Sequence, residues 1–212
     1  MVIAIDGPAG AGKSTVARGL AEALGFTYLD SGAMYRSVAL AALRAGADPD
    51  DAEACAAIAR RARIELDGSS VLLDGEEVSD AIRAAEVTAA ASRVSVHPQV
   101  RRAMVEHQRE LIADGRFVAE GRDIGTVVSP EAGLKVFLVA TDEERARRRA
   151  AQTGESLTEV RDAQAKRDAR DRGREHSPLR AARDAIELDS TGLDAETVIA
   201  RLAAIARERG LA

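Results

Sequence analysis

An apolar run followed by a glycine-rich loop constrains the fold of this chain more than any other feature. Residues 2–6 are apolar up to Asp6, and the residues after them, Gly-Pro-Ala-Gly-Ala-Gly-Lys-Ser, fit the pattern G-x-x-x-x-G-K-[ST]. The apolar run is typical of a buried parallel strand, and the spacing of residues 13–24 predicts a helix that ends at Gly25. This order of strand, loop and helix predicts an α/β fold with a phosphate-binding loop.

The loop predicts binding of a nucleoside triphosphate. Its glycines allow backbone N–H groups to surround phosphate oxygens, and the start of the helix adds partial positive charge. Lys13 would reach the β- and γ-phosphates, and Ser14 would bind Mg²⁺ together with the phosphates of ATP. The predicted ATP-binding residues are Gly7, Pro8, Ala9, Gly10, Ala11, Gly12, Lys13, Ser14 and Thr15. ATPases, GTPases and small-molecule kinases share this loop, so other residues must identify the reaction.

Strands and helices alternate along most of the chain. Further strands are predicted at 26–29, 117–120, 134–140 and 185–188. One helix is predicted at 32–45, and another runs from a cap at Asp50 through Ala62. Two more helices begin at the capping boxes 141–144 and 156–159, and a last one begins at 195 after a cap at Asp194. This alternation predicts a three-layer α/β sandwich with a parallel five-stranded sheet.

Residues 63–80 interrupt the alternation. The runs 64–66 and 71–73 flank a turn at 67–70, and Asp74-Gly75 leads to a third short run at 77–78. A small antiparallel sheet, inserted into the α/β pattern, is expected there. Helices are predicted on its far side at 81–95 and 98–113, with Pro98 separating them.

Composition excludes several classes of protein. The net charge is −5, which argues against a surface devoted to nucleic acid or to anionic membrane. Cys55 is the only cysteine and the three histidines are scattered, so neither an intrachain disulfide nor a zinc site is expected. No apolar run approaches the roughly 18 residues of a membrane span. A cytoplasmic protein is therefore expected.

Five further stretches, together with the loop, carry a family resemblance. They are Leu29-Asp-Ser-Gly-Ala-Met-Tyr-Arg36, Ala91-Ser92 with Arg101, Glu120-Gly-Arg-Asp-Ile-Gly-Thr126, Lys166-Arg-Asp-Ala-Arg-Asp-Arg-Gly-Arg174, and Leu188-Asp-Ser-Thr191. In this order and spacing the chain resembles the bacterial cytidylate kinases, a group of nucleoside monophosphate kinases, from Val2 to about Arg209. Glu120 stands where the family often has Asp, and its role is left open.

The resemblance implies ATP-dependent phosphorylation of CMP and dCMP, with ATP and Mg²⁺, by a monomer. It implies one P-loop kinase domain over 1–212, with an NMP-binding arm that carries the 63–80 insert and a mobile lid over about 141–175. The implied CMP-binding residues are Ser31, Arg36, Ser92, Arg101, Arg122, Asp123, Arg167, Asp171 and Arg174. Lys13, Arg122 and Arg174 would be catalytic, and the lid arginines would be drawn from Arg145, Arg147, Arg148 and Arg149.

The chemistry of the substrates agrees with these residue types. A monophosphate has a second pKa of about 6, so its attacking oxygen is ionised at neutral pH and needs no general base. The site must instead neutralise two polyanions, which guanidinium groups do well. Cytosine offers an amino donor and two acceptors, which Asp123 and Arg101 complement, whereas uracil would mispair with them. CMP is therefore expected to be preferred over UMP.

Two alternatives remain open from the sequence. One is a P-loop kinase of another small acceptor, namely a UMP/CMP, adenylate or shikimate kinase. The other is a nucleotide-dependent switch or a nucleic-acid-binding ATPase, for which the arginine-rich stretch 145–183 would be the binding surface. The chain lacks asparagine, and hence the Asn-Lys-x-Asp motif of regulatory GTPases, and its net charge is negative. Both facts weigh against the second alternative.

Overall fold

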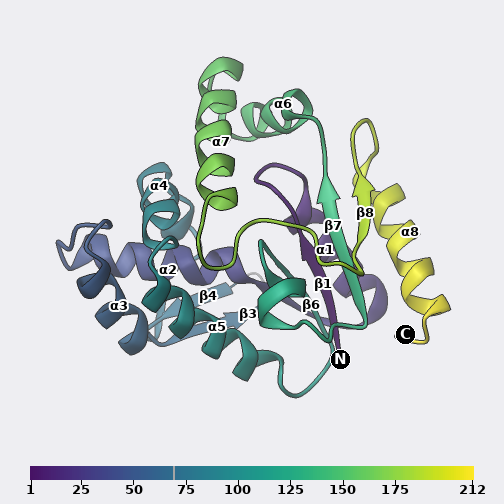
Figure 1. The fold of residues 1–212 in the computed structure, drawn as a ribbon, viewed down its shortest axis with the longest axis horizontal. Coiled ribbons are helices and arrows are strands. Elements are labelled where there is room, and N and C mark those ends of the chain that lie inside the picture. The colour runs from purple at the N-terminus through teal and green to yellow at the C-terminus, as the bar shows by residue number, and fades with distance from the viewer. Residues whose placement is uncertain (69) are drawn as a thin grey trace. The chain divides into compact units, whose positions relative to one another are not determined.

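Two compact units make up the chain in the computed structural model, which describes residues 1–68 and 70–212 (Figure 1). Unit 1 comprises Met1–Tyr28 and Asp114–Ala212, and unit 2 comprises Leu29–Ala113. Each unit has its own cluster of buried hydrophobic side chains. The two units are therefore described in turn.

A five-stranded sheet forms the centre of unit 1, and the last two residues of one of its strands, Leu29 and Asp30, are counted with unit 2. Its strand order is β2-β6-β1-β7-β8, with the bounds β1 Val2–Asp6, β2 Thr27–Asp30, β6 Phe117–Gly121, β7 Leu134–Val139 and β8 Ile186–Asp189. β1 pairs in parallel with β6 and with β7, and β7 pairs in parallel with β8. All five residues of β1 are buried, as expected for a central strand. The predicted parallel sheet is confirmed.

Helices α1 (Lys13–Leu24) and α8 (Ala195–Glu208) pack together beside this sheet. Leu20 of α1 and Leu202 of α8 are fully buried in the same hydrophobic cluster as Val136 of β7. Asp194 caps α8 by accepting a hydrogen bond from the N–H of Thr197 at 2.7 Å, as predicted. Figure 1 shows α8 alongside β8 at the C-terminal end of the chain.

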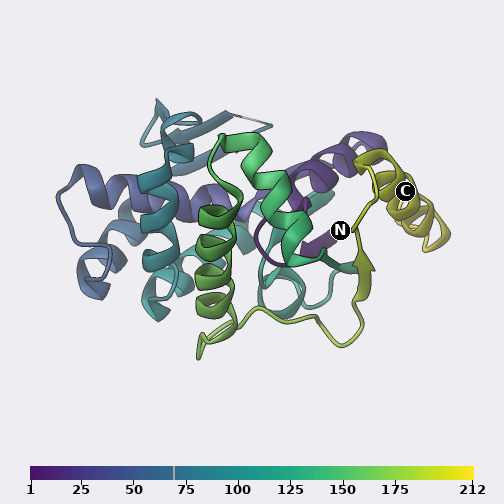
Figure 2. The same ribbon diagram turned by 90° about the horizontal axis from the view of Figure 1, so that it is seen from above.

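Helices α6 (Asp142–Thr153) and α7 (Leu157–Arg172) occupy the stretch predicted to be the lid. They lie side by side in both views (Figure 1, Figure 2). The side-chain oxygens of Thr141 and Ser156 accept hydrogen bonds from the N–H groups of Glu144 and Glu159, so both predicted capping boxes are confirmed. A short π-helix, η2 (Ile124–Val128), follows β6 and was not predicted from the sequence.

Unit 2 is mainly helical. Its elements are α2 Ser31–Arg44, α3 Ala52–Arg61, β3 Ile64–Asp67, β4 Ser70–Leu73, β5 Glu76–Glu77, the 3-10 helix η1 Ala81–Arg83, α4 Ala85–Val94 and α5 Pro98–Ile112. β3, β4 and β5 form an antiparallel sheet, which confirms the insert predicted at 63–80. Ser69, in the predicted turn at 67–70, lies outside the described residues.

Two local predictions for unit 2 were wrong. Asp51, not Asp50, caps α3, because its side chain accepts hydrogen bonds from the N–H groups of Glu53 and Ala54. Asp50 is instead ion-paired with Arg93 of α4 at 2.5 Å. The helix predicted at 81–95 is broken at Ala84, whose extended ψ of 145° separates η1 from α4.

Candidate active site

The glycine-rich loop of unit 1 has the backbone that the sequence predicts. β1 ends at Asp6, and α1 begins at Lys13 after Gly12 in the N-cap position. Gly7 has a φ of +151°, and a Cβ placed on it would lie 2.1 Å from the carbonyl oxygen of Leu138. Only glycine can occupy that position without displacing β7. The loop is thereby held against the sheet, and the N–H groups of the first turn of α1 have no acceptor within the helix.

Lys13 is buried, with 6% of its surface exposed, and its Nζ donates a hydrogen bond to the carbonyl oxygen of Pro8 at 2.8 Å. Burial, together with the nearby charge of Arg122, lowers the pKa of Lys13 to about 7, whereas the charge of Glu120 opposes the shift. Ser14 and Thr15, by contrast, are exposed at the start of α1. The hydroxyl of Ser14 is therefore accessible from outside the protein.

The lowered pKa of Lys13 predicts that ATP binding takes up a proton. At about pH 8 the amine is mostly neutral in the free protein, and adjacent phosphates raise its pKa, so binding adds up to about one proton per site. The uptake declines as the pH falls below about 7, where the free amine is already charged. Calorimetric titrations in buffers of different ionisation enthalpy measure this uptake.

A Lys13→Arg variant is the matched control, because a guanidinium stays charged at every pH of the experiment. The difference in proton uptake between the wild type and Lys13→Arg isolates the lysine from the ionisation of ATP itself. Equal uptake by the two proteins would contradict the assignment.

Asp171 of α7 brings two predicted phosphate-binding arginines together. Its carboxylate accepts a hydrogen bond from Nε of Arg122 at 2.9 Å and another from Nη2 of Arg174. Only 1% of Asp171 is exposed. Burial acts to raise the pKa of Asp171, but the positive charges of Arg122, Arg174 and Arg167 outweigh it and hold this pKa below its usual range. Asp171 therefore stays ionised and orients the guanidinium groups.

Glu120 and Asp123 flank Arg122 at the end of β6. Both carboxylates are buried, and Glu120 accepts a hydrogen bond from the hydroxyl of Tyr28 at 2.5 Å. Glu120 also acts on the pKa of Lys13, which places the two charges near each other. The carboxyl end of β6 thus presents three charged side chains beside the loop.

The four arginines of α6 that were predicted to belong to a lid differ in their surroundings. Arg145 is buried, donates a hydrogen bond to the carbonyl oxygen of Ala9 at 2.7 Å, and pairs with Asp168 of α7 at 2.7 Å. Arg148 donates to the carbonyl oxygen of Ser190 at 2.7 Å. Exposed Arg147 pairs with Glu144, and Arg149 is half-buried. Arg145 thus joins α6, α7 and the glycine-rich loop.

The remaining predicted site residues belong to unit 2. Ser31 begins α2, and Arg36 on the same helix pairs with Asp30 at 2.9 Å. Ser92 on α4 and Arg101 on α5 are both buried. The guanidinium carbon of Arg101 lies 5.4 Å from the ring centre of Tyr35, and its Nη1 donates to the carbonyl oxygen of Ser95 at 3.2 Å.

Sequence reasoning missed four residues beside these groups. Asp6 binds the backbone of η2, Asp168 pairs with Arg145, Gln164 donates to the carbonyl oxygen of Arg145 at 3.2 Å, and Ser190 contacts Arg148. The place of Asp6, between a buried strand and a phosphate-binding loop, was a usable signal. Asp168 and Ser190 lie within the family stretches 166–174 and 188–191, whereas nothing in the spacing marked Gln164.

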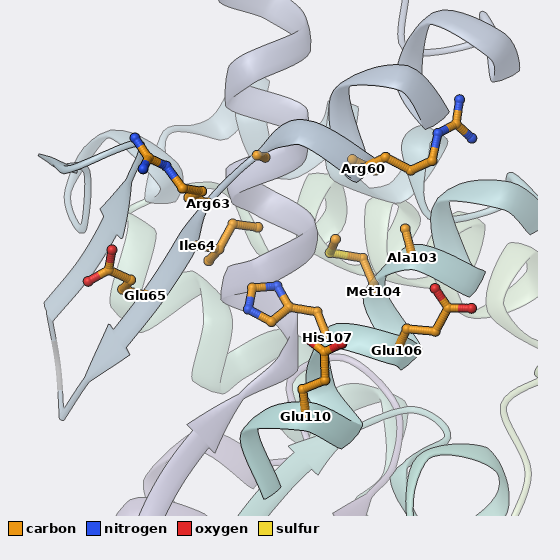
Figure 3. Close-up of a pocket in the computed structure, with 11 residues that line it drawn as sticks. Arg60, Arg63, Ile64, Glu65, Ala103, Met104, Glu106, His107 and Glu110 are labelled. Carbon is orange, nitrogen blue, oxygen red and sulfur yellow. The ribbon is translucent and has the colours of Figure 1, made fainter. Parts of the chain in front are cut away.

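A cavity in unit 2 lies away from these residues (Figure 3). It measures about 440 Å³ between α3, β3 and α5, and the figure shows His107 and Glu110 of α5 together with Arg63 and Glu65 at β3. None of the predicted site residues lines it. Among the described residues, no group of three or more His, Cys, Asp or Glu side chains could hold a metal ion. No described helix is both long enough and apolar enough to cross a membrane.

Comparison with known proteins gives a consistent family. The cytidylate kinase family model matches residues 3–208. A cytidylate kinase of Solibacter usitatus is 49% identical over 99% of this chain and 93% of the relative. A cytidylate kinase of Geobacter sulfurreducens is 46% identical over 99% of this chain and 94% of the relative. Among solved structures, a protein from Eubacterium ventriosum has a TM-score of 0.58 at 12% identity, over 98% of both chains, which supports the fold alone.

Proposed function

Because this chain belongs to the cytidylate kinase family, we propose that it transfers the γ-phosphoryl group of ATP to CMP and to dCMP, producing CDP and dCDP. The observation that best supports this function is the cluster in unit 1 in which Asp171 orients Arg122 and Arg174, while Arg122 acts electrostatically on Lys13. In-line transfer between two polyanions needs a cation at the transferred phosphoryl group and two cations at the acceptor phosphate.

The glycine-rich loop would hold ATP. Its backbone and the start of α1 fit the triphosphate, Lys13 would contact the β- and γ-phosphates, and exposed Ser14 would bind Mg²⁺ with the phosphates. When bound, Mg²⁺ neutralises charge on the donor phosphates. Glu120 lies close enough to oppose the lowering of the pKa of Lys13. Arg145 holds the lid helices on the loop, and the other lid arginines would approach the donor phosphates.

The acceptor residues divide by the part of CMP that each would contact. Arg36, Arg122 and Arg174, with Ser31, would bind the phosphate, and Asp171 and Arg167 would lie at the sugar hydroxyls. Asp123, Arg101 and Ser92 would read the cytosine base, with a carboxylate for its amino group and a guanidinium for its acceptors. These roles come from the family motif, and the burial of Ser92, Arg101 and Asp123 supports the base-reading ones.

Asp123→Ala is expected to reduce kcat/KM for CMP by about tenfold to 100-fold and to reduce the preference for CMP over UMP by about tenfold or more. The reason is that the cytosine amino group loses its buried acceptor. Steady-state assays with both nucleotides at saturating ATP measure the change. Asp114→Ala, at an exposed position of the same unit, is the control and should retain the wild-type preference. An unchanged CMP/UMP preference in Asp123→Ala would argue against base reading by Asp123.

A coupled kinase assay over CMP, dCMP, UMP, AMP and shikimate tests the proposed function directly. CMP and dCMP should be the best acceptors. A higher kcat/KM for another acceptor would show that this acceptor, and not CMP, is the substrate. If DNA or RNA stimulated ATP turnover and CMP did not, the protein would be a nucleic-acid-dependent ATPase and not a CMP kinase.

The proposal extends to the setting in which the protein works. We expect a cytoplasmic monomer that acts as one kinase domain, with residues 63–80 as an insert in the NMP-binding arm and about 141–175 as a lid. A lid would exclude water from bound ATP and so suppress hydrolysis. Neither nucleic acid nor a membrane is an expected partner, given the net charge of −5.

A further inference from the structure

Asp6 is a buried carboxylate that the chemistry above does not use. It is the last residue of β1, only 5% of it is exposed, and the glycine-rich loop begins at the next residue. One carboxylate oxygen accepts a hydrogen bond from the N–H of Ile124 at 2.8 Å, and the other accepts one from the N–H of Gly125 at 2.7 Å. Both oxygens are thus bound to consecutive backbone groups at the start of η2.

The segment that Asp6 binds follows directly on two predicted substrate-binding residues. Arg122 and Asp123 lie between Gly121, which pairs in register with Asp6 on the sheet, and the two N–H groups that Asp6 holds. The chain around Arg122 and Asp123 is therefore fixed to the end of β1 on both sides. The same end of β1 also fixes the start of the phosphate-binding loop.

The fit around Gly125 restricts how this segment can move. A Cβ on Gly125 would lie 3.3 Å from the side chain of Lys135 and 3.4 Å from the carboxylate of Asp6. Lys135 is itself held, because its Nζ donates to Asp184 at 2.8 Å. The segment is packed between two anchored side chains, so loss of the carboxylate would change its position rather than one contact alone.

An ionised carboxylate at this buried position lowers the stability of the fold. Burial, with a smaller contribution from the negative charge of Asp123, raises the pKa of Asp6 to about 7, although the N–H groups of Gly125 and Ile124 and the charge of Lys13 oppose the rise. A buried group that opposes stability is more common at functional sites than in ordinary cores.

We propose that Asp6 is a positioning residue that fixes Arg122 and Asp123 relative to the phosphate-binding loop by holding the backbone of Ile124 and Gly125. It acts through these backbone groups and does not touch the nucleotides. This role rests on the proposed function, because it assumes that Arg122 and Asp123 bind CMP.

Asp6→Asn tests the role with almost no change in volume. An amide has one acceptor oxygen and an NH₂ group, so it cannot accept from both N–H groups. The affinity for CMP, measured by calorimetry without ATP, should fall about tenfold or more. Val118→Ala, a buried change in β6 that leaves the carboxylate intact, is the control for general loss of stability, and its CMP affinity should stay within about threefold of wild type.

A double-mutant cycle separates positioning from a structural role. If Asp6 acts through Asp123, Asp6→Asn alone should reduce the CMP/UMP preference, and the double variant Asp6→Asn with Asp123→Ala should show no reduction beyond that of Asp123→Ala alone. Val118→Ala alone should leave this preference unchanged. Should Asp6→Asn fail to fold, Gly125→Ala tests the same segment from its other side and should also weaken CMP binding.

The outcomes distinguish this inference from the proposed function. A wild-type protein that does not phosphorylate CMP overturns the proposed function. A wild-type protein that phosphorylates CMP, together with an Asp6→Asn variant that binds CMP normally, overturns the positioning role alone. Additive effects of Asp6→Asn and Asp123→Ala on the CMP/UMP preference would overturn the positioning role as well.

Discussion

Replacement of Lys13 by alanine is expected to lower kcat for CMP phosphorylation by about 10³-fold, a larger loss than we expect from substitution of Asp123 or Asp171. In the proposed mechanism, Lys13 is the cation of the glycine-rich loop that contacts the transferred phosphoryl group. Negative charge redistributes over that group in the transition state, and no other lysine of the loop can replace the ammonium. Steady-state kinetics with CMP and ATP measure the loss.

The fold should survive the Lys13→Ala change. Burial disfavours the charged ammonium, as its lowered pKa indicates, so removal of the side chain relieves a cost while losing one hydrogen bond to Pro8. Thermal unfolding should therefore show a midpoint close to that of wild type. Lys166→Ala, an exposed lysine on α7, is the matched control and should keep its activity. Near-normal turnover by Lys13→Ala would refute the assigned mechanism.

Replacement of Asp171 by asparagine is expected to lower kcat/KM by about 100-fold for both CMP and dCMP. Asp171 orients Arg122 and Arg174, and both substrates carry the phosphate that these arginines would bind. Without the carboxylate, two guanidinium groups of low exposure lose their shared counter-charge. Removing one partner of a buried ion pair typically lowers the free energy of unfolding by about 3–5 kcal/mol. The thermal midpoint should fall together with the activity.

Comparison of the two nucleotides separates the possible roles of Asp171. A contact with the 2′-hydroxyl alone would reduce activity on CMP and spare dCMP, which lacks this group. A loss on both nucleotides indicates that Asp171 acts through the arginines. Asp162→Asn, at an exposed position of the same helix, is the control and should behave as wild type. A loss confined to CMP would contradict the orienting role.

Much of the fold could be predicted because its signals are local. The apolar run of β1, the capping residues Thr141, Ser156 and Asp194, and the alternating pattern of the antiparallel insert each depend on a few neighbouring residues. Hydrophobic periodicity and capping chemistry act over the same short range. The glycine-rich loop was predictable for the same reason, since its pattern is contiguous.

Contacts between distant residues could not be predicted in this way. The carboxylate of Asp6 accepts hydrogen bonds from Ile124 and Gly125, which follow it in the sequence by 118 and 119 residues. The ion pair between Arg145 and Asp168 joins two helices. Asp50 and Asp51 were equally good caps by local pattern, and the pairing of Asp50 with Arg93, 43 residues away, distinguishes them. The roles of the CMP-binding residues stay predictions, supported by family membership and by burial.

The two tyrosines described above make this protein its own spectroscopic probe. The chain has no tryptophan and only two tyrosines, so Tyr28 and Tyr35 dominate its near-ultraviolet absorption and fluorescence. The hydroxyl of Tyr28 donates a hydrogen bond to Glu120 in unit 1, and the ring of Tyr35 lies against Arg101 in unit 2. Each chromophore therefore touches a charged side chain, one in each unit. Single Tyr→Phe variants would leave one emitter at a time, so that each unit can be followed separately without an added label.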